Sequence, residues 1–291
     1  MWPRTFIHGR HMLRFGWPYM VIAVTAAVIP AVDRFFITHY LNLESMGLYA
    51  VGYKFAFLLM LPITAFQTAW APFGFAIYKE ANAAETYNKV LTYYVASITV
   101  LAFCLIAVSQ PMISLLASSR YLAGSIVVMP IAFGLILEST AWILGLGLDL
   151  SKRTHFSALS YFMGLSVSAL TIWFLIKPLG ILGVAYGMMA GRVAQGFGYS
   201  FFAYRAHPLR FGWKIPGVVL GAGLALSVVT QKISPALSVY TVGARVLLLL
   251  VLLGIIWKGA IRAREREAIL REGKAAISAA ISRSRVAWSR S

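Results

Sequence analysis

The sequence predicts an all-α integral membrane protein with about eight transmembrane helices. Of its 291 residues, 60% are hydrophobic and only 12% are charged, whereas charged residues make up about 25% of a typical soluble protein. The mean hydropathy is +0.77. Apolar runs that can cross a hydrocarbon core of about 30 Å, which takes roughly 20 helical residues, recur along the chain. These three observations exclude a water-soluble fold.

The predicted spans are eight apolar runs separated by charged or Pro- and Gly-rich breaks. Basic residues concentrate before the first span, after every second span and in the C-terminal tail, and these segments hold 19 of the 26 Lys and Arg. Cytoplasmic segments are enriched in Lys and Arg, so both termini are predicted to be cytoplasmic. The spans are residues 17–37, 47–70, 90–109, 122–148, 156–176, 181–203, 215–233 and 239–257.

The tail, residues 259–291, is strongly basic, and the whole chain has a formal net charge of +17. One interpretation is a solvated anchor that fixes the orientation of the spans. The alternative is a helix that lies on anionic lipid of the cytoplasmic leaflet. Nucleic acid is not an expected partner, because no nucleic-acid-binding motif accompanies the charge.

A charged group within a span costs roughly 2.5 to 3.5 kcal/mol on insertion scales, so ionisable side chains there point to a polar cavity, and five are worth weighing. They are Asp33, Arg34, Lys54, Glu138 and Arg192. Asp33 lies at a depth similar to that of Lys54, and Glu138 lies near the midplane with Arg192. Each pair is either a structural ion pair between helices or part of a polar cavity that binds an anion. Glu138 is the only mid-span carboxylate that could couple movement to a proton.

Glycine and proline mark further features of the spans. Prolines within spans can mark broken helices, which commonly line cavities in transporters. The alternative is that they mark ordinary helix kinks. In the sixth span, glycines at four-residue spacing allow a neighbouring helix to approach closely. The prolines are Pro18, Pro30, Pro62, Pro72 and Pro130, and the glycines are Gly183, Gly187 and Gly191.

No catalytic residue, metal site or cofactor is expected. Cys104 is the only cysteine, which excludes an intrachain disulfide and a cysteine-based metal site. The chain has no Gly-rich phosphate loop and no recognisable Ser/His/Asp arrangement. His8 and His11 are close in sequence, but their spacing alone is a poor metal signal.

An ordered set of motifs runs through residues 17–73: a Pro near the start of a span, Asp-Arg-Phe at its outer end, Gly-x-Tyr-Ala and a Lys in the next span, and Ala-Trp-x-Pro at its end. Tyr121 with Pro130, and the stretch KPLGILGVAYG at 177–187, extend the set. Over about residues 12–210 the sequence resembles the C-terminal half of the oligosaccharide flippases. These polysaccharide biosynthesis proteins, or O-antigen transporters, belong to the multidrug/oligosaccharidyl-lipid/polysaccharide exporter superfamily. The first motifs comprise Pro18, Asp33, Arg34, Phe35, Gly47, Tyr49, Ala50, Lys54, Ala69, Trp70 and Pro72.

The resemblance implies the C-terminal lobe of a two-lobe exporter, in which a central cavity opens alternately to each side of the membrane. Residues 17–206 would be the six-helix lobe, residues 207–258 two additional transmembrane helices, residues 1–16 a cytoplasmic lead-in and residues 259–291 the basic tail. One lobe cannot enclose a two-sided cavity. Three expectations follow: the chain is a fragment, it joins a separate N-terminal half, or it pairs with a second copy.

The resemblance also implies a substrate and its binding groups. The substrate would be a polyprenyl-diphosphate-linked oligosaccharide, moved across a bacterial inner membrane for surface polysaccharide such as lipopolysaccharide O-antigen. Arg34, Lys54 and Arg192 would line the cavity and hold the diphosphate or acidic sugars, while Asp33 and Glu138 stay ion-pair or coupling candidates. The alternatives are an exporter of small molecules or peptidoglycan precursors from the same superfamily, and a non-transporting membrane partner of glycan assembly. A polymerase or ligase is disfavoured, because the outer gaps are too short for a large catalytic loop.

Overall fold

The structure is a computed structural model that describes residues 3–80, 82–151, 153–206, 211–234 and 238–259. All its regular secondary structure in these ranges is helical, which confirms the predicted all-α class. The elements are α1 (Pro3–Tyr40), α2 (Leu43–Phe57), α3 (Met60–Ile77), α4 (Ala83–Leu116), the 3₁₀ helix η1 (Ser119–Val127), α5 (Val128–Leu144), α6 (Leu146–Leu150), α7 (Thr154–Leu179), α8 (Ile181–Ala206), α9 (Lys214–Lys232) and α10 (Val239–Gly259).

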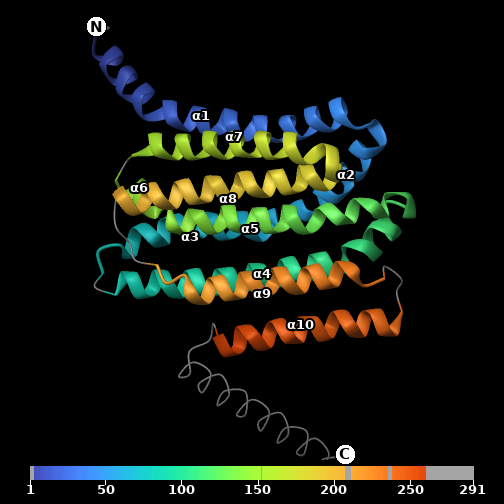
Figure 1. Cartoon of the computed structure of the whole chain (residues 1–291). Coiled ribbons are helices and arrows are strands. Elements are labelled where there is room, and N and C mark those ends of the chain that lie inside the picture. Colours follow the sequence, from blue (N-terminus) through green and yellow to red (C-terminus); the bar gives the residue numbers. More distant parts are fainter. Residues whose placement is uncertain (1–2, 81, 152, 207–210, 235–237, 260–291) are drawn as a thin grey trace, which may run out of the picture.

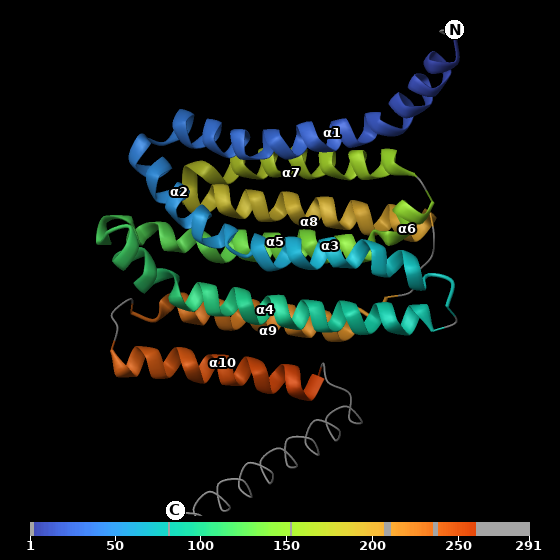
Figure 2. The same cartoon turned by 180° about the vertical axis from the view of Figure 1, so that it is seen from behind.

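The long helices run side by side in a stack that begins with α1 and continues through α7, α8, α5 and α4 to α10 (Figures 1 and 2). Helix α3 packs against α5, and α9 packs against α4. Helices α3, α6 and α8 end, and α4, α7 and α9 begin, at one end of the stack; α1, α7 and α9 end, and α2, α8 and α10 begin, at the other (Figure 1). The described basic residues at these helix ends, Lys79, Lys89, Arg153, Arg205 and Lys214, therefore share one end, as the alternating charge pattern predicts.

Each of the eight predicted spans lies on helical segments of this stack. By length and composition, six helical segments could cross a membrane, or up to seven when the bent pair α2–α3 counts as one span. The predicted span 181–203 lies on α8, which is not in that set. Its 26 residues are long enough, about 39 Å at 1.5 Å per residue, but Arg192, Gln195 and several glycines lower its hydropathy. The chain is a multi-pass membrane protein, and α8, a long helix outside that set, lies inside the stack (Figure 1).

The two ends of the chain differ in how far the structure describes them. Helix α1 begins at Pro3, so residues 3–16 of the predicted lead-in continue into the first span as one helix. Residues 260–291 of the predicted basic tail lie outside the described residues. The contact of this tail with anionic lipid stays a prediction.

The second predicted span is bent by 41° between α2 and α3. Pro62 is the third residue of α3 and lacks the N–H that would donate to the Leu58 carbonyl four residues earlier. The Leu61 N–H donates to that carbonyl instead, at 3.2 Å, which tightens the chain into a turn. Pro62 therefore accounts for the break. The break lies at residues 57–60, near the centre of the predicted span.

Helices α7 and α8 form the most extensive helix pair, and glycines make their contact close. A Cβ atom at Gly183 would overlap the Leu175 carbonyl of α7, and one at Gly187 would overlap Ile172. At Gly191 it would lie 2.6 Å from the Gly164 carbonyl oxygen. The glycine spacing in the sixth span is thus confirmed as a helix-packing surface.

This close contact predicts that a single methyl group at Gly183 destabilises the protein. Gly183→Ala should lower the free energy of unfolding by about 1–3 kcal/mol, because the methyl meets backbone atoms that cannot rotate away. The matched control is Gly221→Ala on α9, where a Cβ meets nothing within 4 Å; it should leave stability unchanged or raise it slightly. Thermal unfolding of the purified variants in detergent measures both. Equal melting temperatures for the two variants would contradict the close packing.

Candidate functional site

The central polar group of the bundle is an ion pair between α8 and α5. Arg192 Nη1 contacts Glu138 Oε2, and the two side chains are 13% and 19% exposed. Gln195 Nε2 donates a hydrogen bond to Glu138 Oε1 at 3.3 Å. The structure thus brings together the two mid-span charges that the sequence singles out. Their opposite charges compensate each other where water is scarce.

A second polar contact links α1, α2 and α8 next to this pair. Asp33 is 1% exposed and accepts a hydrogen bond from the Tyr49 hydroxyl at 2.9 Å. The same hydroxyl lies 3.7 Å from Met188 Sδ, one helical turn before Arg192. Asp33 and Arg192 are near enough for their charges to interact. The structure does not bring Asp33 together with Lys54, the partner that similar depth suggests.

Two buried polar atoms of this cluster have no hydrogen-bond partner among the described residues. They are Asp33 Oδ1 and Arg192 Nε. Burial of a polar atom without a partner is unfavourable. Both atoms therefore gain from any rearrangement or bound group that supplies a partner, which marks the cluster as a place where contacts can change.

A cavity of about 220 Å³ lies against the break between α2 and α3. Tyr53, Phe57 and Met60 line it from the broken span, and Glu138 and Arg192 line it from α5 and α8. The broken backbone thus faces the buried ion pair across a cavity. In membrane proteins, irregular backbone at membrane depth is tolerated where it is buried in protein or lines a cavity.

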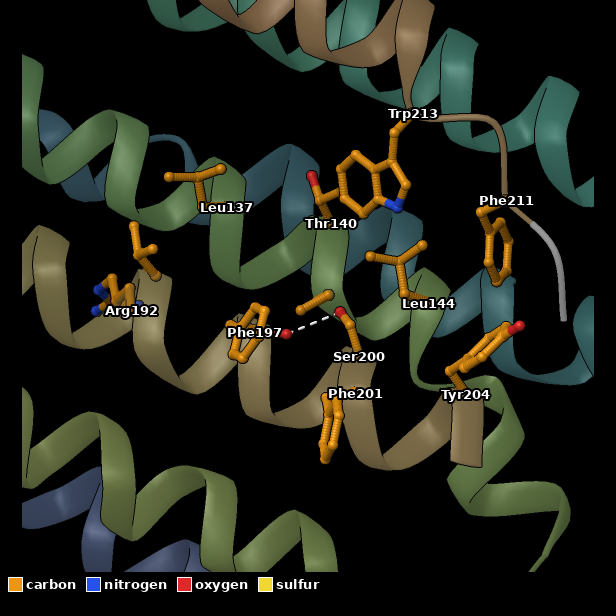
Figure 3. Close-up of a pocket in the computed structure, with 13 residues that line it drawn as sticks. Leu137, Thr140, Leu144, Arg192, Phe197, Ser200, Phe201, Tyr204, Phe211 and Trp213 are labelled. Atoms are coloured by element: carbon orange, nitrogen blue, oxygen red, sulfur yellow. Dashed lines mark hydrogen bonds between the residues drawn. The ribbon is translucent and has the colours of Figure 1, made fainter. Parts of the chain in front are cut away.

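A larger cavity, of about 690 Å³, lies along α5 and α8 and reaches the segment 211–213 (Figure 3). Arg192 lines this cavity as well as the smaller one, so its side chain stands between the two. The other lining residues are mostly apolar or aromatic and include Leu137, Leu144, Phe197, Phe201, Tyr204, Phe211 and Trp213.

Arg34 and Lys54 lie apart from this cluster. Both side chains are exposed, Arg34 on α1 and Lys54 on α2. Neither forms an ion pair with any residue that the structure describes. In the sequence, Lys54 lies between Tyr53 and Phe57, which line the smaller cavity. Lys54 itself is not one of the lining residues. Of the three predicted cavity cations, Arg192 is therefore the one that lines these two cavities.

Sequence reasoning missed Gln195 and the contact of Tyr49 with Asp33. Gln195 follows Arg192 by three residues on a helix, a spacing that puts two side chains on one face, so a search for polar neighbours of Arg192 could have found it. Tyr49 stands in the Gly-x-Tyr-Ala motif, but the motif does not indicate its contact with Asp33, which depends on how α2 is rotated against α1. Within the described residues, no group of three or more His, Cys, Asp or Glu side chains could hold a metal ion.

Residues 1–126 match the family model of a polysaccharide biosynthesis protein. This match confirms the predicted resemblance, and it includes Asp33, Arg34 and Lys54, whereas Glu138 and Arg192 follow the matched segment. It supports a role in polysaccharide biosynthesis or export. No curated protein and no solved structure gives a significant match to the chain.

The buried ion pair predicts a strong energetic coupling between Arg192 and Glu138. Arg192→Gln and Glu138→Gln should each lower the free energy of unfolding by about 3–5 kcal/mol, because each leaves one buried charge unpaired. The double variant should recover most of this loss, since no charge remains. Thermal unfolding of the three purified variants and the parent forms a double-mutant cycle. Additive effects in the double variant would contradict a direct pair.

Proposed function

We propose that the chain is one lobe of a flippase that moves polyprenyl-diphosphate-linked oligosaccharide across a bacterial inner membrane by alternating access, with both termini in the cytoplasm. The observation that carries this proposal is the buried Arg192–Glu138 pair, which stands between two cavities beside a broken span. The match of residues 1–126 to polysaccharide biosynthesis proteins supports the choice of substrate. The mechanism requires no covalent chemistry.

The exposed cations support an aqueous cavity next to α2. Lys54 lies about 16 Å along the helix axis from Leu43, at 1.5 Å per residue, and thus well inside the span. A cation that faces lipid there costs roughly 2.5 to 3.5 kcal/mol. Lys54 is exposed and has no ion-pair partner in the described part of the chain. The exposed position of Lys54 therefore fits a water-filled space better than lipid.

In the proposed mechanism these cations attract the substrate and the buried pair responds to it. Lys54 and Arg34 create a positive field that favours a diphosphate. Glu138 neutralises Arg192 in this structure, so Arg192 binds an anion only when the pair opens. A substrate phosphate that competes with Glu138 would open it, and the bend between α2 and α3 supplies a hinge beside the pair.

The proposed transport also requires a second body to close the cavity. The exposed face of α1 and α2 would meet either an N-terminal half or a second copy of this chain. In both cases the diphosphate would lie between the two bodies, while its polyprenyl chain stays in the membrane.

The proposal predicts that Lys54→Gln lowers surface polysaccharide in cells whose chromosomal copy of the gene is deleted. We expect a several-fold loss at an unchanged protein level, because the substitution removes a charge that attracts the diphosphate. Lys177→Gln on α7 is the matched control and should restore the parent level. Surface glycan is quantified by gel electrophoresis and immunoblotting. Normal glycan with changed drug sensitivity would instead favour a small-molecule exporter.

The water-filled face predicts a difference in thiol labelling. In a Cys104→Ser background, Lys54→Cys should react with a membrane-impermeant maleimide in intact membranes. Leu247→Cys, on the 62% exposed and apolar α10 position, should react at least tenfold more slowly, because lipid surrounds it. Mass shift on a gel follows both reactions. Equal protection of the two cysteines would place Lys54 against lipid and reject the proposed cavity.

A further inference from the structure

One face of α8 carries an apolar stripe that ends in a cation. Val193, Phe197, Phe201 and Arg205 recur every four residues and therefore share a face. The first three are 44%, 69% and 42% exposed. The rings of Phe197 and Phe201 stack with their centroids 6.2 Å apart, and the Arg205 guanidinium lies 4.7 Å from the centroid of the Phe201 ring.

This stripe forms one wall of the larger cavity, which makes the cavity a groove along the surface of the bundle. Val193, Phe197 and Phe201 both line the cavity and are exposed. The floor is kept low by small residues, since a Cβ atom at Gly196 would lie only 3.3 Å from Ala141 Cβ. From residue 193 to residue 204 the groove follows α8 for about 16 Å. Its 690 Å³ is the size of a site for a small amphipathic molecule, which is typically about 300–1,000 Å³.

The two ends of the groove differ in charge. Tyr204 and Trp213 line one end (Figure 3). Arg205 and Lys214, which follow them directly in the sequence, are both exposed. Aromatic residues of this kind mark the interface between lipid and water. The other end reaches Arg192, whose charge Glu138 neutralises. Net positive charge is therefore found only at the interfacial end of the groove, among its described residues.

We propose that this groove binds one anionic phospholipid of the surrounding bilayer. Its phosphate contacts Arg205 and Lys214, and one acyl chain lies against Phe201, Phe197 and Val193. The positive end complements the headgroup, and the apolar stripe complements the chain. This groove shares Arg192 with the proposed transport site, but no residue of α1 or α2 lines it, and the proposed lipid contacts use neither Lys54 nor Arg34.

Native mass spectrometry of the delipidated, purified full chain tests the site. We expect the parent protein to bind one phosphatidylglycerol at least about tenfold more tightly than phosphatidylcholine. Arg205→Glu should weaken phosphatidylglycerol binding by roughly tenfold, because it reverses the charge at the headgroup. Ser200→Trp should abolish the specific binding, since Ser200 lies in the middle of the groove and an indole there would fill it (Figure 3).

Two matched variants control for charge and bulk. Arg153→Glu reverses an exposed charge at the same end of the stack, and Ser166→Trp adds an indole on α7; neither residue lines the groove. Both should bind phosphatidylglycerol as the parent does. Size-exclusion profiles check that Ser200→Trp folds. If Ser200→Trp does not fold, the binding of phosphatidylglycerol by Arg205→Glu decides the outcome. Equal binding by Arg205→Glu and the parent, no preference for phosphatidylglycerol, or tighter binding of a polyprenyl phosphate would each overturn the proposal.

Discussion

The ion pair between Arg192 and Glu138 constrains the rest of this bundle. Two charged groups in the hydrocarbon core must face each other or water, because a lone charge there costs several kcal/mol. The pair ties α8 to α5 and holds α8, whose stretch of membrane length is too polar to count among the candidate spans, in the interior of the stack. Apolar helices such as α1 and α10 then form the outside (Figure 1). The order of layers follows from the need to shield the charged face of α8 from lipid.

Helix α8 meets this need with two different surfaces. Towards α7 it presents glycines, so the two backbones touch and few side chains are required between them. Towards α5 it presents Arg192 and Gln195, whose contacts with Glu138 are polar and directional. Glycine packing is short-ranged and tolerates little displacement, whereas an ion pair can exchange partners. The α7 side is therefore suited to hold α8 in place, and the α5 side is where a bound anion could take over a contact.

The spans and the buried pair could be predicted from sequence because both follow from composition: apolar length in one case, and isolated mid-span charges of opposite sign in the other. The side chains that surround Asp33 could not be predicted from sequence. The inward face of α2 carries Tyr49, Gly52 and Ala56, and Lys54 lies two residues from the last two of these, about 200° away on a helix. Helix α2 is apolar on most sides, so its sequence does not show which face packs inward. Asp33 therefore contacts Tyr49 and not Lys54, the partner that its similar depth in the membrane suggested.

The two kinds of charge in this chain suit different tasks. The Arg192–Glu138 pair carries no net charge, so it exerts little attraction on a distant anion and acts only on contact. Lys54 is uncompensated among the described residues, and its field extends into whatever space α2 faces. If the proposed second body is another copy of this chain, two Lys54 side chains would share one cavity, and their repulsion would be relieved by a bound diphosphate. If it is a different lobe, that lobe need supply only a wall, because the attraction already resides here. In both arrangements Lys54 first attracts the anion, and the anion then competes with Glu138 for Arg192. The proposed cycle therefore has an order, in which attraction precedes the rearrangement of the buried pair.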